Sequence, residues 1–509
     1  MIVVPLEAYS KADCSPTERS PVQPNSKPGE SMESRGGAPS PHLLFVTSPM
    51  QGHINPVRRL AARAAAAGAA VTVSTAVSGH RRMFPSLASP GEEAVDAAGV
   101  LHAPFSDGYD EGVDPRVHDM RSFAARARAV GRESLAGVVA RLAERGRPVT
   151  CVVYTFFVGW VPEVARAGGV PSALFWIQPA AVFAVYYHYF HGHDAVLASC
   201  ANDPDRDAVV QLPGLPPLRP RALPSVVALT SPEQRGYEVV GTLRDLFLAL
   251  DDDEHRTKVL VNTFDALEPD ALRAVPGLEL VAVGPVVPDG ASPSTTDLSL
   301  RDNDDDDDVN GYMEWLDTKA ARSVVYVSFG TIFAASKRQE LETLQGLKAT
   351  GRPYLWVSRK VAEDGAELDG AGAGGGADGG RGIMVEWCDQ VRVLSHPAVG
   401  CFVTHCGWNS ALESIACGVP VVAVPQWTDQ PTVAWLVEEC AGVGVRAQAD
   451  GEGVAERGEL QRCVETVMGD GEAAVEIRAC AAKWMERARE ALAAGGTLER
   501  NLRAFLSGF

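Results

Sequence analysis

The feature that most constrains the fold is a repeated alternation of short apolar runs with helix-like segments. Three of the runs are HLLFVTS at His42–Ser48, VTCVVYT at Val149–Thr155 and GCFVTH at Gly400–His405. Strands that are buried on both faces show such unbroken apolar runs, and they belong to parallel sheets covered by helices on both sides. The alternation therefore predicts an α/β fold with doubly wound parallel sheets.

The alternation occurs in two separate sets along a chain of 509 residues, a length at which two domains are expected. We expect an N-terminal domain over residues 41–285 and a C-terminal domain over residues 311–485. An acidic linker over residues 286–310 joins them. A disordered tail rich in Pro and Ser covers residues 1–40, and a helix over residues 486–509 ends the chain.

The overall charge restricts the partners of the chain. With 46 Lys and Arg against 65 Asp and Glu, the net charge is −19, which argues against nucleic acid or an anionic membrane as a partner. No run approaches the ~20 apolar residues that span a bilayer. The 10 cysteines are scattered and form no C-x-x-C pair, as expected for reduced thiols in an intracellular protein. We therefore expect a cytoplasmic monomer that acts on a small molecule.

Polar residues gather at one strand-to-helix junction, in the segment VTHCGWNSALES at Val403–Ser414. We expect a helix from about Trp408 to Cys417, with Gly418 as its stop. Asn409 and Ser410 then lie in its first turn, where backbone N–H groups are unpaired and the helix dipole is positive. Such a helix end binds anions, above all phosphate.

Two further residues extend this pattern toward a nucleotide. His405, at the end of the strand, can donate to a phosphate oxygen, and Glu413, one helical turn beyond Asn409, can accept hydrogen bonds from a ribose diol. A simpler interpretation is that Asn409 and Ser410 only cap the helix while Glu413 lies in solvent. The segment alone leaves both interpretations open.

Two other motifs are expected to carry no function. The glycine-rich segment Gly370–Gly380 contains G-x-G-x-x-G, but no apolar strand precedes it and no helix follows, so it is expected to be a low-complexity loop. The run Asp304–Asp308 is expected to be a solvated part of the linker.

The 44 residues from Trp387 to Gln430 closely resemble the signature of the plant family-1 glycosyltransferases of secondary metabolism, which use UDP-sugars. Length, order and spacing match, and the wider resemblance covers nearly everything from His42 to Phe509. The resemblance implies a GT-B fold, in which two Rossmann-like domains face each other and a C-terminal helix packs back across the cleft. It also implies that the N-terminal domain binds the acceptor and the C-terminal domain the UDP-sugar.

The resemblance further implies a donor site for UDP-glucose. Trp387 and Cys388 would bind uracil, and Gln390 and Glu413 the ribose. The pyrophosphate would be bound by His405, Asn409, Ser410 and Thr331. The hexose would be bound by Trp408, Asp429 and Gln430. A final Gln in this signature usually accompanies glucose. One departure is Asp389, where the family mostly carries Pro. Because inverting enzymes of this kind hold pyrophosphate with a helix end, no metal is expected, not even at the His-rich segment Tyr186–Asp194.

The candidate catalytic base is His53 in PMQGHINP, on the expected loop between the first strand and a helix capped by Asn55 and starting at Pro56. Open α/β sheets bind ligands at this edge, and a positive helix start disfavours the protonated ring, so the imidazole is kept as a base. The resemblance places the family's catalytic His at the same position. That base would take the acceptor's proton as the acceptor oxygen attacks the anomeric carbon.

The family's usual partner of this His is an Asp, and the alignment on Trp160 places Thr155 there. A hydroxyl can hydrogen-bond the imidazole but cannot stabilise an imidazolium by charge. We therefore hypothesise an acceptor that loses its proton easily, such as a carboxylic acid, which is already ionised at neutral pH, or an acidic phenol.

The segments SDGYDEG, VYTFF and FWIQPAAVFAVYYHYF resemble one branch of the family. That branch includes anthocyanin 5-O-glucosyltransferases and enzymes that form glucose esters of auxin-like acids and crocetin. The sequence thus predicts an inverting, UDP-glucose-dependent glucosyltransferase for an aromatic or apocarotenoid acid or an acidic phenol. The alternatives are a flavonoid or anthocyanin O-glucosyltransferase, and a nucleotide-sugar-binding protein without transfer activity.

Overall fold

The computed structural model describes residues 3–5, 40–114, 118, 120–203, 208–252, 258–287, 311–330, 336–358 and 381–509. Most of the expected tail and linker, the Asp run, the glycine-rich segment and Thr331 lie outside these residues. Within the tail, the expected disorder does not extend to β1 (Val3–Pro5), which pairs antiparallel with β8 (Ala208–Val210). Val286 and Val287, at the start of the expected linker, are buried.

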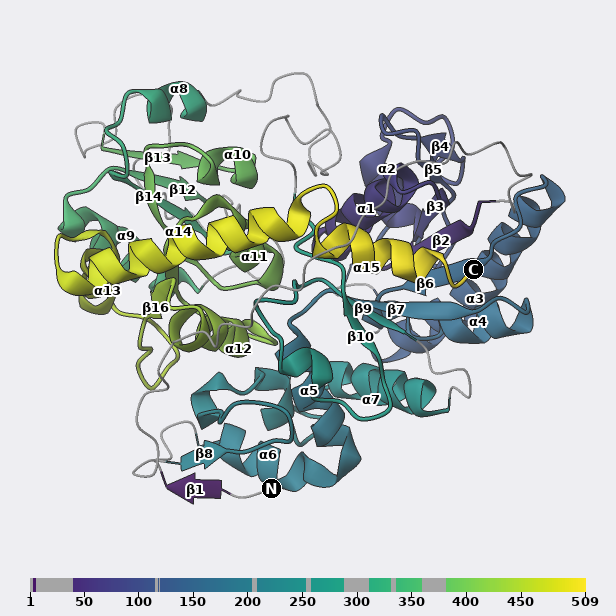
Figure 1. The fold of residues 1–509 in the computed structure, drawn as a ribbon, viewed down its shortest axis with the longest axis horizontal. Helices are drawn as coiled ribbons and strands as arrows, with labels where there is room; N and C mark the ends of the chain where they lie inside the picture. The colour runs from purple at the N-terminus through teal and green to yellow at the C-terminus, as the bar shows by residue number, and fades with distance from the viewer. Residues whose placement is uncertain are drawn as a thin grey trace, which may run out of the picture.

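The N-terminal half forms an eight-stranded sheet in the order β10-β9-β7-β6-β2-β3-β5-β4, parallel except for the pair β4–β5 (Figure 1). Its strands are β2 (His42–Thr47), β3 (Ala70–Thr75), β4 (Ala94–Val95), β5 (Leu101–His102), β6 (Cys151–Tyr154), β7 (Ser172–Trp176), β9 (Val259–Val261) and β10 (Leu280–Ala282). The helices of this half are α1 (Gln51–Ala66), α2 (Val77–Met83), α3 (Met120–Glu144), α4 (Val161–Ala167), α5 (Ala180–His188), α6 (Asp194–Ala201) and α7 (Glu238–Asp251).

The C-terminal half forms a six-stranded parallel sheet in the order β13-β12-β11-β14-β15-β16. Its strands are β11 (Val324–Ser328), β12 (Tyr354–Val357), β13 (Gly382–Val385), β14 (Val399–Thr404), β15 (Val421–Ala423) and β16 (Gly444–Arg446). Its helices are α8 (Tyr312–Asp317), α9 (Lys337–Thr350), α10 (Gln390–Leu394), α11 (Trp408–Cys417), α12 (Gln430–Trp435) and α13 (Arg457–Met468). The predicted pair of parallel α/β units is confirmed.

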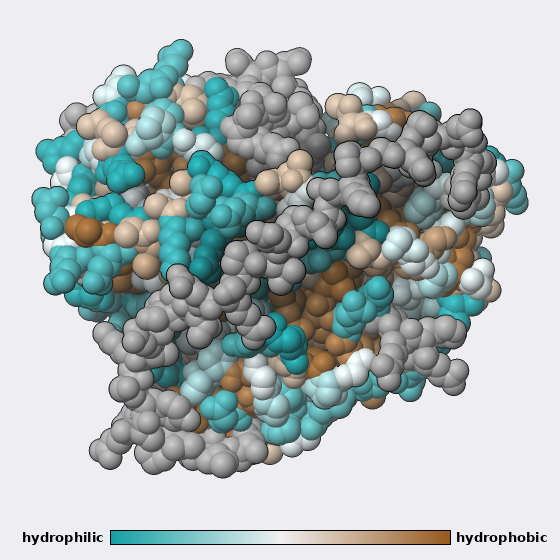
Figure 2. Space-filling view, in the orientation of Figure 1, coloured by the Kyte–Doolittle hydropathy of each residue, from teal (hydrophilic) through white to brown (hydrophobic). Residues whose placement is uncertain are grey.

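The chain ends in two helices that connect the halves, α14 (Glu472–Leu492) and α15 (Thr497–Leu506). The first runs along the C-terminal half, and its outward face is mostly hydrophilic (Figure 2). The second lies against the N-terminal half (Figure 1), where Asn501 Nδ2 donates to the carbonyl oxygen of Ala282 at 2.9 Å. The expected packing of the C-terminal segment back across the two domains is therefore confirmed. The expected single helix over residues 486–509 is wrong, because α14 ends at Leu492 and α15 begins at Thr497.

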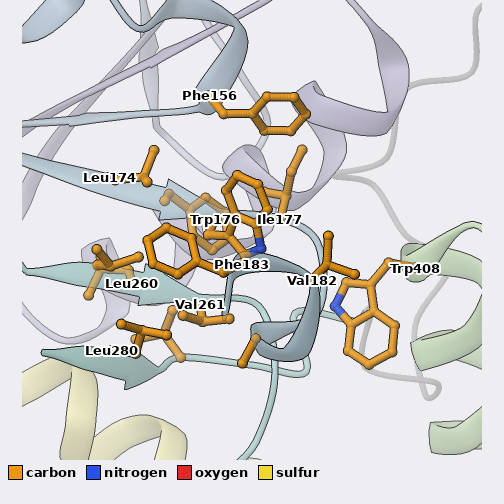
Figure 3. Packing of buried hydrophobic residues seen from close by; sticks show 14 of the residues in the cluster. Phe156, Leu174, Trp176, Ile177, Val182, Phe183, Leu260, Val261, Leu280 and Trp408 are labelled. Carbon is orange, nitrogen blue, oxygen red and sulfur yellow. The ribbon is translucent and has the colours of Figure 1, made fainter. Parts of the chain in front are cut away.

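Buried apolar side chains continue from one half into the other. The cluster around β7 and β9 includes Leu174, Trp176 and Leu260, and it extends to Trp408 of α11 in the other half. Figure 3 shows Trp408 beside Val182 of α5. Since apolar burial is a main source of folding free energy, the two halves stabilise each other through this shared core.

Helix α1 begins five residues earlier than the sequence indicated. The expected cap Asn55 and start at Pro56 are wrong, because the helix runs from Gln51 with Met50 as N-cap, and Pro56 lies inside it. A proline has no N–H to donate to the carbonyl four residues before it, which here is that of Gly52. That carbonyl instead accepts a hydrogen bond from Asn409 Nδ2 of the other half, at 2.9 Å.

The start of α5 is occupied by a side chain of the protein itself. Glu268 is 3% exposed, and its Oε1 and Oε2 accept hydrogen bonds from the backbone N–H groups of Ala181 and Ala180 at 2.9 and 3.1 Å. A carboxylate thus takes the place that an anionic ligand could have at this helix end. By contrast, α11 has Gly407 as its N-cap, which carries no side chain to do the same.

Replacing Glu268 by Ala leaves two buried N–H donors unpaired. We expect Glu268→Ala to lower the free energy of unfolding by about 1–3 kcal/mol, measured by urea denaturation. The control is Glu279→Ala, whose side chain is 65% exposed and lies 3.7 Å from Lys258; it should change stability by less than about 0.5 kcal/mol. Equal effects of the two variants would contradict this role.

Candidate active site

Helix α11 starts and ends where the sequence predicted. It runs from Trp408 to Cys417, and Gly418 follows in the left-handed conformation with φ of 69°. Asn409 and Ser410 lie in its first turn but do not cap it, and Glu413 is only 5% exposed. The simpler interpretation, with two capping side chains and a solvated acid, is therefore wrong.

The side chains at the start of α11 form a hydrogen-bonded group. Gln390 Nε2 donates to Ser410 Oγ at 2.9 Å and to Glu413 Oε2 at 2.7 Å. Asn409 is engaged by the other domain: its Nδ2 donates to Gly52, and its Oδ1 accepts from Asn262 Nδ2 at 3.4 Å. The structure therefore brings the predicted ribose and pyrophosphate residues of α10 and α11 together beside the start of α1.

His405 lies at the end of β14 with its ring between two glycines. A Cβ on Gly330 would lie 2.7 Å from its ring, and a Cβ on Gly407 would lie 2.6 Å from Nε2. Burial lowers the pKa of His405 to about 4, so the ring is neutral at physiological pH. A neutral imidazole can still donate to an oxygen through its protonated nitrogen.

The residues expected to bind uracil lie between β13 and α10. Trp387 is half-buried, and Cys388 is buried with its Sγ 3.4 Å from the hydroxyl of Tyr326. Asp389 is the N-cap of α10, where Oδ1 accepts from the backbone N–H of Arg392 at 3.0 Å. This cap gives the departure from Pro a physical reason, since Asp is a favoured N-cap residue.

The side chains expected to contact the hexose already make hydrogen bonds within the protein. Burial raises the pKa of Asp429 to about 6, and its Oδ1 accepts from the hydroxyl of Thr428 at 2.8 Å. Gln430 Oε1 accepts from the backbone N–H groups of Gln426 and Trp427, at 2.8 and 2.9 Å. Trp408 directs its indole N–H to the carbonyl of Asn262, at 2.7 Å, so a hexose contact from Trp408 would use its backbone N–H.

His53 lies in the first turn of α1 and not on a loop, which corrects the expectation from sequence. Its Nδ1 is 3.3 Å from Thr155 Oγ1, and Thr155 Oγ1 is 3.1 Å from Thr47 Oγ1. The rings of Phe156 and Phe157 pack together beside the imidazole, with centroids at 4.9 and 5.1 Å from it. Burial lowers the pKa of His53 to about 3, so the imidazole is neutral at physiological pH.

Sequence reasoning missed the residues that join the two domains here. Asn262, on the segment after β9, and Arg59, on α1, both contact α11, and Gly52 supplies the carbonyl that Asn409 binds. The contact of Gly52 could have been predicted from Pro56, because a proline inside a helix leaves the carbonyl four residues earlier without its helical N–H partner. Neither Arg59 nor Asn262 lies in a sequence motif from which its contact with α11 could be predicted.

The side chains of the His-rich segment Tyr186–Asp194 are not arranged as metal ligands. His191 stacks on Tyr187 with ring centroids 3.9 Å apart and lies 3.2 Å from a carboxylate oxygen of Asp251. Among the residues that the structure describes, no group of three or more His, Cys, Asp or Glu side chains is arranged to hold a metal ion. In the same residues, no helix has the length and apolar character to cross a membrane.

Two α/β domains, each built on a largely parallel sheet and joined through the contacts of α1 with α11, have the arrangement of a GT-B fold. The model of the family "UDP-glucoronosyl and UDP-glucosyl transferase" matches residues 300–473. The chain is 43% identical over 475 residues to the chloroplastic crocetin glucosyltransferase of Gardenia jasminoides, covering 91% of this chain and 96% of that protein. The chain belongs to this family and is a UDP-glycosyltransferase.

Further comparisons agree with this assignment. The chain is 43% identical over 469 residues to anthocyanidin 3-O-glucoside 5-O-glucosyltransferase 1 of Perilla frutescens, covering 91% of this chain and 98% of that protein. Among solved structures, Os79 from O. sativa in complex with UDP aligns with a TM-score of 0.73 and 32% identity, covering 91% of this chain and 99% of that chain. The predicted plant family and GT-B fold are thus confirmed.

A methyl group on Gly407 would collide with His405 and displace the ring from the start of α11. We expect Gly407→Ala to weaken UDP binding at least about tenfold by calorimetry, the effect of losing a hydrogen bond to a charged group. The matched control is Gly458→Ala near the start of α13, where a Cβ would meet no atom within 4 Å. Unchanged UDP affinity in Gly407→Ala would remove His405 from the site.

The burial of His53 makes stability depend on pH. The unfolded chain takes up a proton at this ring below pH 6.5, whereas the folded chain does so only near pH 3. Stability conferred by the neutral ring is therefore lost as the pH falls below 6.5, by up to about 1.4 kcal/mol per pH unit. Urea denaturation between pH 7 and 5 should show a shallower decline for His53→Gln than for the wild type. Parallel declines would contradict the depressed pKa.

Proposed function

We propose that the enzyme transfers glucose from UDP-glucose to a small lipophilic plant metabolite, at a carboxyl group or an acidic phenolic hydroxyl. The observation that carries this proposal is the pair His53 and Thr155, which stands where a charged pair is usual in the family. The proposal rests on the identity of this pair together with the donor-type residues at the start of α11.

The donor is proposed to lie along α10 and α11. The pyrophosphate would meet the first-turn N–H groups of α11 with Asn409, Ser410 and His405, and the ribose diol would meet Glu413 and Gln390. Trp387 would stack on uracil. The hexose would lie toward Asp429 and Gln430, whose neighbouring acid and amide suit the equatorial hydroxyls of glucose. No metal is assigned a role, because a helix end and neutral donors suffice to hold the pyrophosphate.

His53 is proposed as the general base. When the proton is on Nδ1, it can be donated to Thr155 Oγ1, while the hydroxyl of Thr155 donates to Thr47 Oγ1. Nε2 then carries the lone pair that accepts the acceptor's proton. The acceptor oxygen bonds to the anomeric carbon as the bond from that carbon to UDP breaks on the opposite side, so the product has inverted, β configuration.

The chemistry of the acceptor follows from what Thr155 cannot do. An Asp would stabilise the imidazolium that forms when His53 takes a proton, and a neutral hydroxyl does so poorly. A carboxylate acceptor is already ionised and has no proton to lose, and an acidic phenol loses its proton with little help from a base. The aromatic rings of Phe156 and Phe157 beside His53 suit a flat apolar ligand.

Named activities of similar proteins agree with this range of acceptors. One relative is named for crocetin, one for anthocyanidin glucosides, and a third, from Malus domestica, for phloretin. Flavonoid hydroxyls are therefore the alternative acceptors. The location of the enzyme in the cytoplasm stays a prediction, as does its monomeric state; the Gardenia relative is named as chloroplastic.

The direct experiment is to incubate the purified enzyme and UDP-glucose with flavonoids, auxins, benzoates and apocarotenoid acids, and to identify the products by mass spectrometry. Mild alkali cleaves a glucose ester readily and leaves a glycoside intact. Ester products from the acids would support the proposal, glycosides alone would favour the flavonoid alternative, and failure to turn over UDP-glucose with any acceptor would favour a protein that only binds it.

The role of Thr155 predicts a difference between acceptors. Thr155→Asp should raise kcat/KM at least about tenfold for weakly acidic hydroxyl acceptors and leave it unchanged for carboxylates, because only the former need a stabilised imidazolium. Thr155→Asn is the matched control, since it has nearly the shape of Asp without its charge. Equal effects of Thr155→Asp on both acceptor classes would sink the hypothesis.

A further inference from the structure

Arg59 of α1 reaches across the domain interface to the predicted ribose residue. Its Nη2 donates to Glu413 Oε1 at 2.9 Å, and its Nη1 donates to the carbonyl oxygen of Val286 at 3.0 Å. The side chains of Arg59 and Glu413 are 6% and 7% exposed. A carboxylate of the C-terminal domain is thus paired with a guanidinium of the N-terminal domain, away from water.

The carboxylate of Glu413 is held from both domains. Arg59 binds Oε1, while Gln390 binds Oε2 at 2.7 Å from within the C-terminal domain. Two donors on two different oxygens fix the plane of the carboxylate as well as its position. A carboxylate has about four acceptor positions on its two oxygens, so protein donors and a ligand hydroxyl can share one carboxylate.

The charge of Arg59 also affects what Glu413 can do. A buried carboxylate is stable in its ionised form only when it is paired and hydrogen-bonded, and the ionised form is the one whose two oxygens both accept from a diol. The guanidinium supplies that pairing, and its planar fork is anchored by the second bond to Val286, so its direction is fixed.

We propose that Arg59 is a positioning residue of the donor site: it orients Glu413 so that the carboxylate accepts hydrogen bonds from the ribose hydroxyls of UDP-glucose. The acceptor-binding domain thereby completes the ribose subsite of the other domain. This inference rests on the proposed function, in which Glu413 holds the ribose.

The same helix offers a matched control. Arg63 lies one turn beyond Arg59 on α1 and donates to the carbonyl oxygen of Val287, the neighbour of Val286, at 3.4 Å. A role limited to attaching α1 to this segment would make the two arginines equivalent. If Arg59 orients Glu413, only the substitution of Arg59, and not that of Arg63, should change recognition of the ribose.

The experiment compares UDP with 2′-deoxyUDP, which lacks one ribose hydroxyl. Calorimetry gives the ratio of the two dissociation constants for the wild type, Arg59→Gln, Arg59→Lys, Arg63→Gln and Glu413→Gln. Because both ligands are measured on the same preparation, a lower folded fraction cancels from the ratio. We expect the wild type and Arg63→Gln to favour UDP about tenfold, the effect of one hydrogen bond to a charged group.

In Arg59→Gln the preference should fall to about threefold or less, and Arg59→Lys should restore part of it by returning the charge. A wild-type ratio in Arg59→Gln, together with a lost preference in Glu413→Gln, would overturn the inference and leave the proposed function standing. A wild-type ratio in Glu413→Gln would instead remove Glu413 from the ribose subsite, and with it that part of the proposed function.

Discussion

The hydrogen bonds between α1 and α11 across the domain interface are the constraint on which both candidate sites depend. Pro56 cannot donate to the carbonyl of Gly52, and Asn409 uses that carbonyl instead, at 2.9 Å. Gly52 directly precedes His53. A residue expected to hold the donor therefore also fixes the backbone next to the proposed base, and Arg59 and Glu413 repeat the connection further along both helices.

Charge is distributed in these sites in a way that suits an anionic substrate. His53 and His405 are kept neutral by burial and supply no positive charge. The positive potential for a pyrophosphate then comes from backbone N–H groups at the start of α11, which need no counter-ion when the ligand leaves. At the start of α5, Glu268 already occupies the equivalent position, so that helix end is closed to a ligand.

The fold and the start of α11 could be predicted from sequence because their signals are local. Apolar runs identify buried parallel strands, and Gly418 marks the end of α11 as expected. The start of α1 was missed because Pro56 normally marks a first helical turn, whereas here the interface accommodates it inside the helix. The contacts of Arg59 and Asn262 could not be predicted, since their partners lie more than 140 positions away in sequence.

The shared core and the paired helices have a consequence for how such enzymes diversify. Trp408 inserts into the core of the opposite domain and bonds to Asn262, so the two halves are not independent modules. Exchanging one half between relatives would therefore also exchange the surface that α11 packs against. The residues at the positions of Arg59 and Asn262 would then have to match those of α11 for the two halves to pack together.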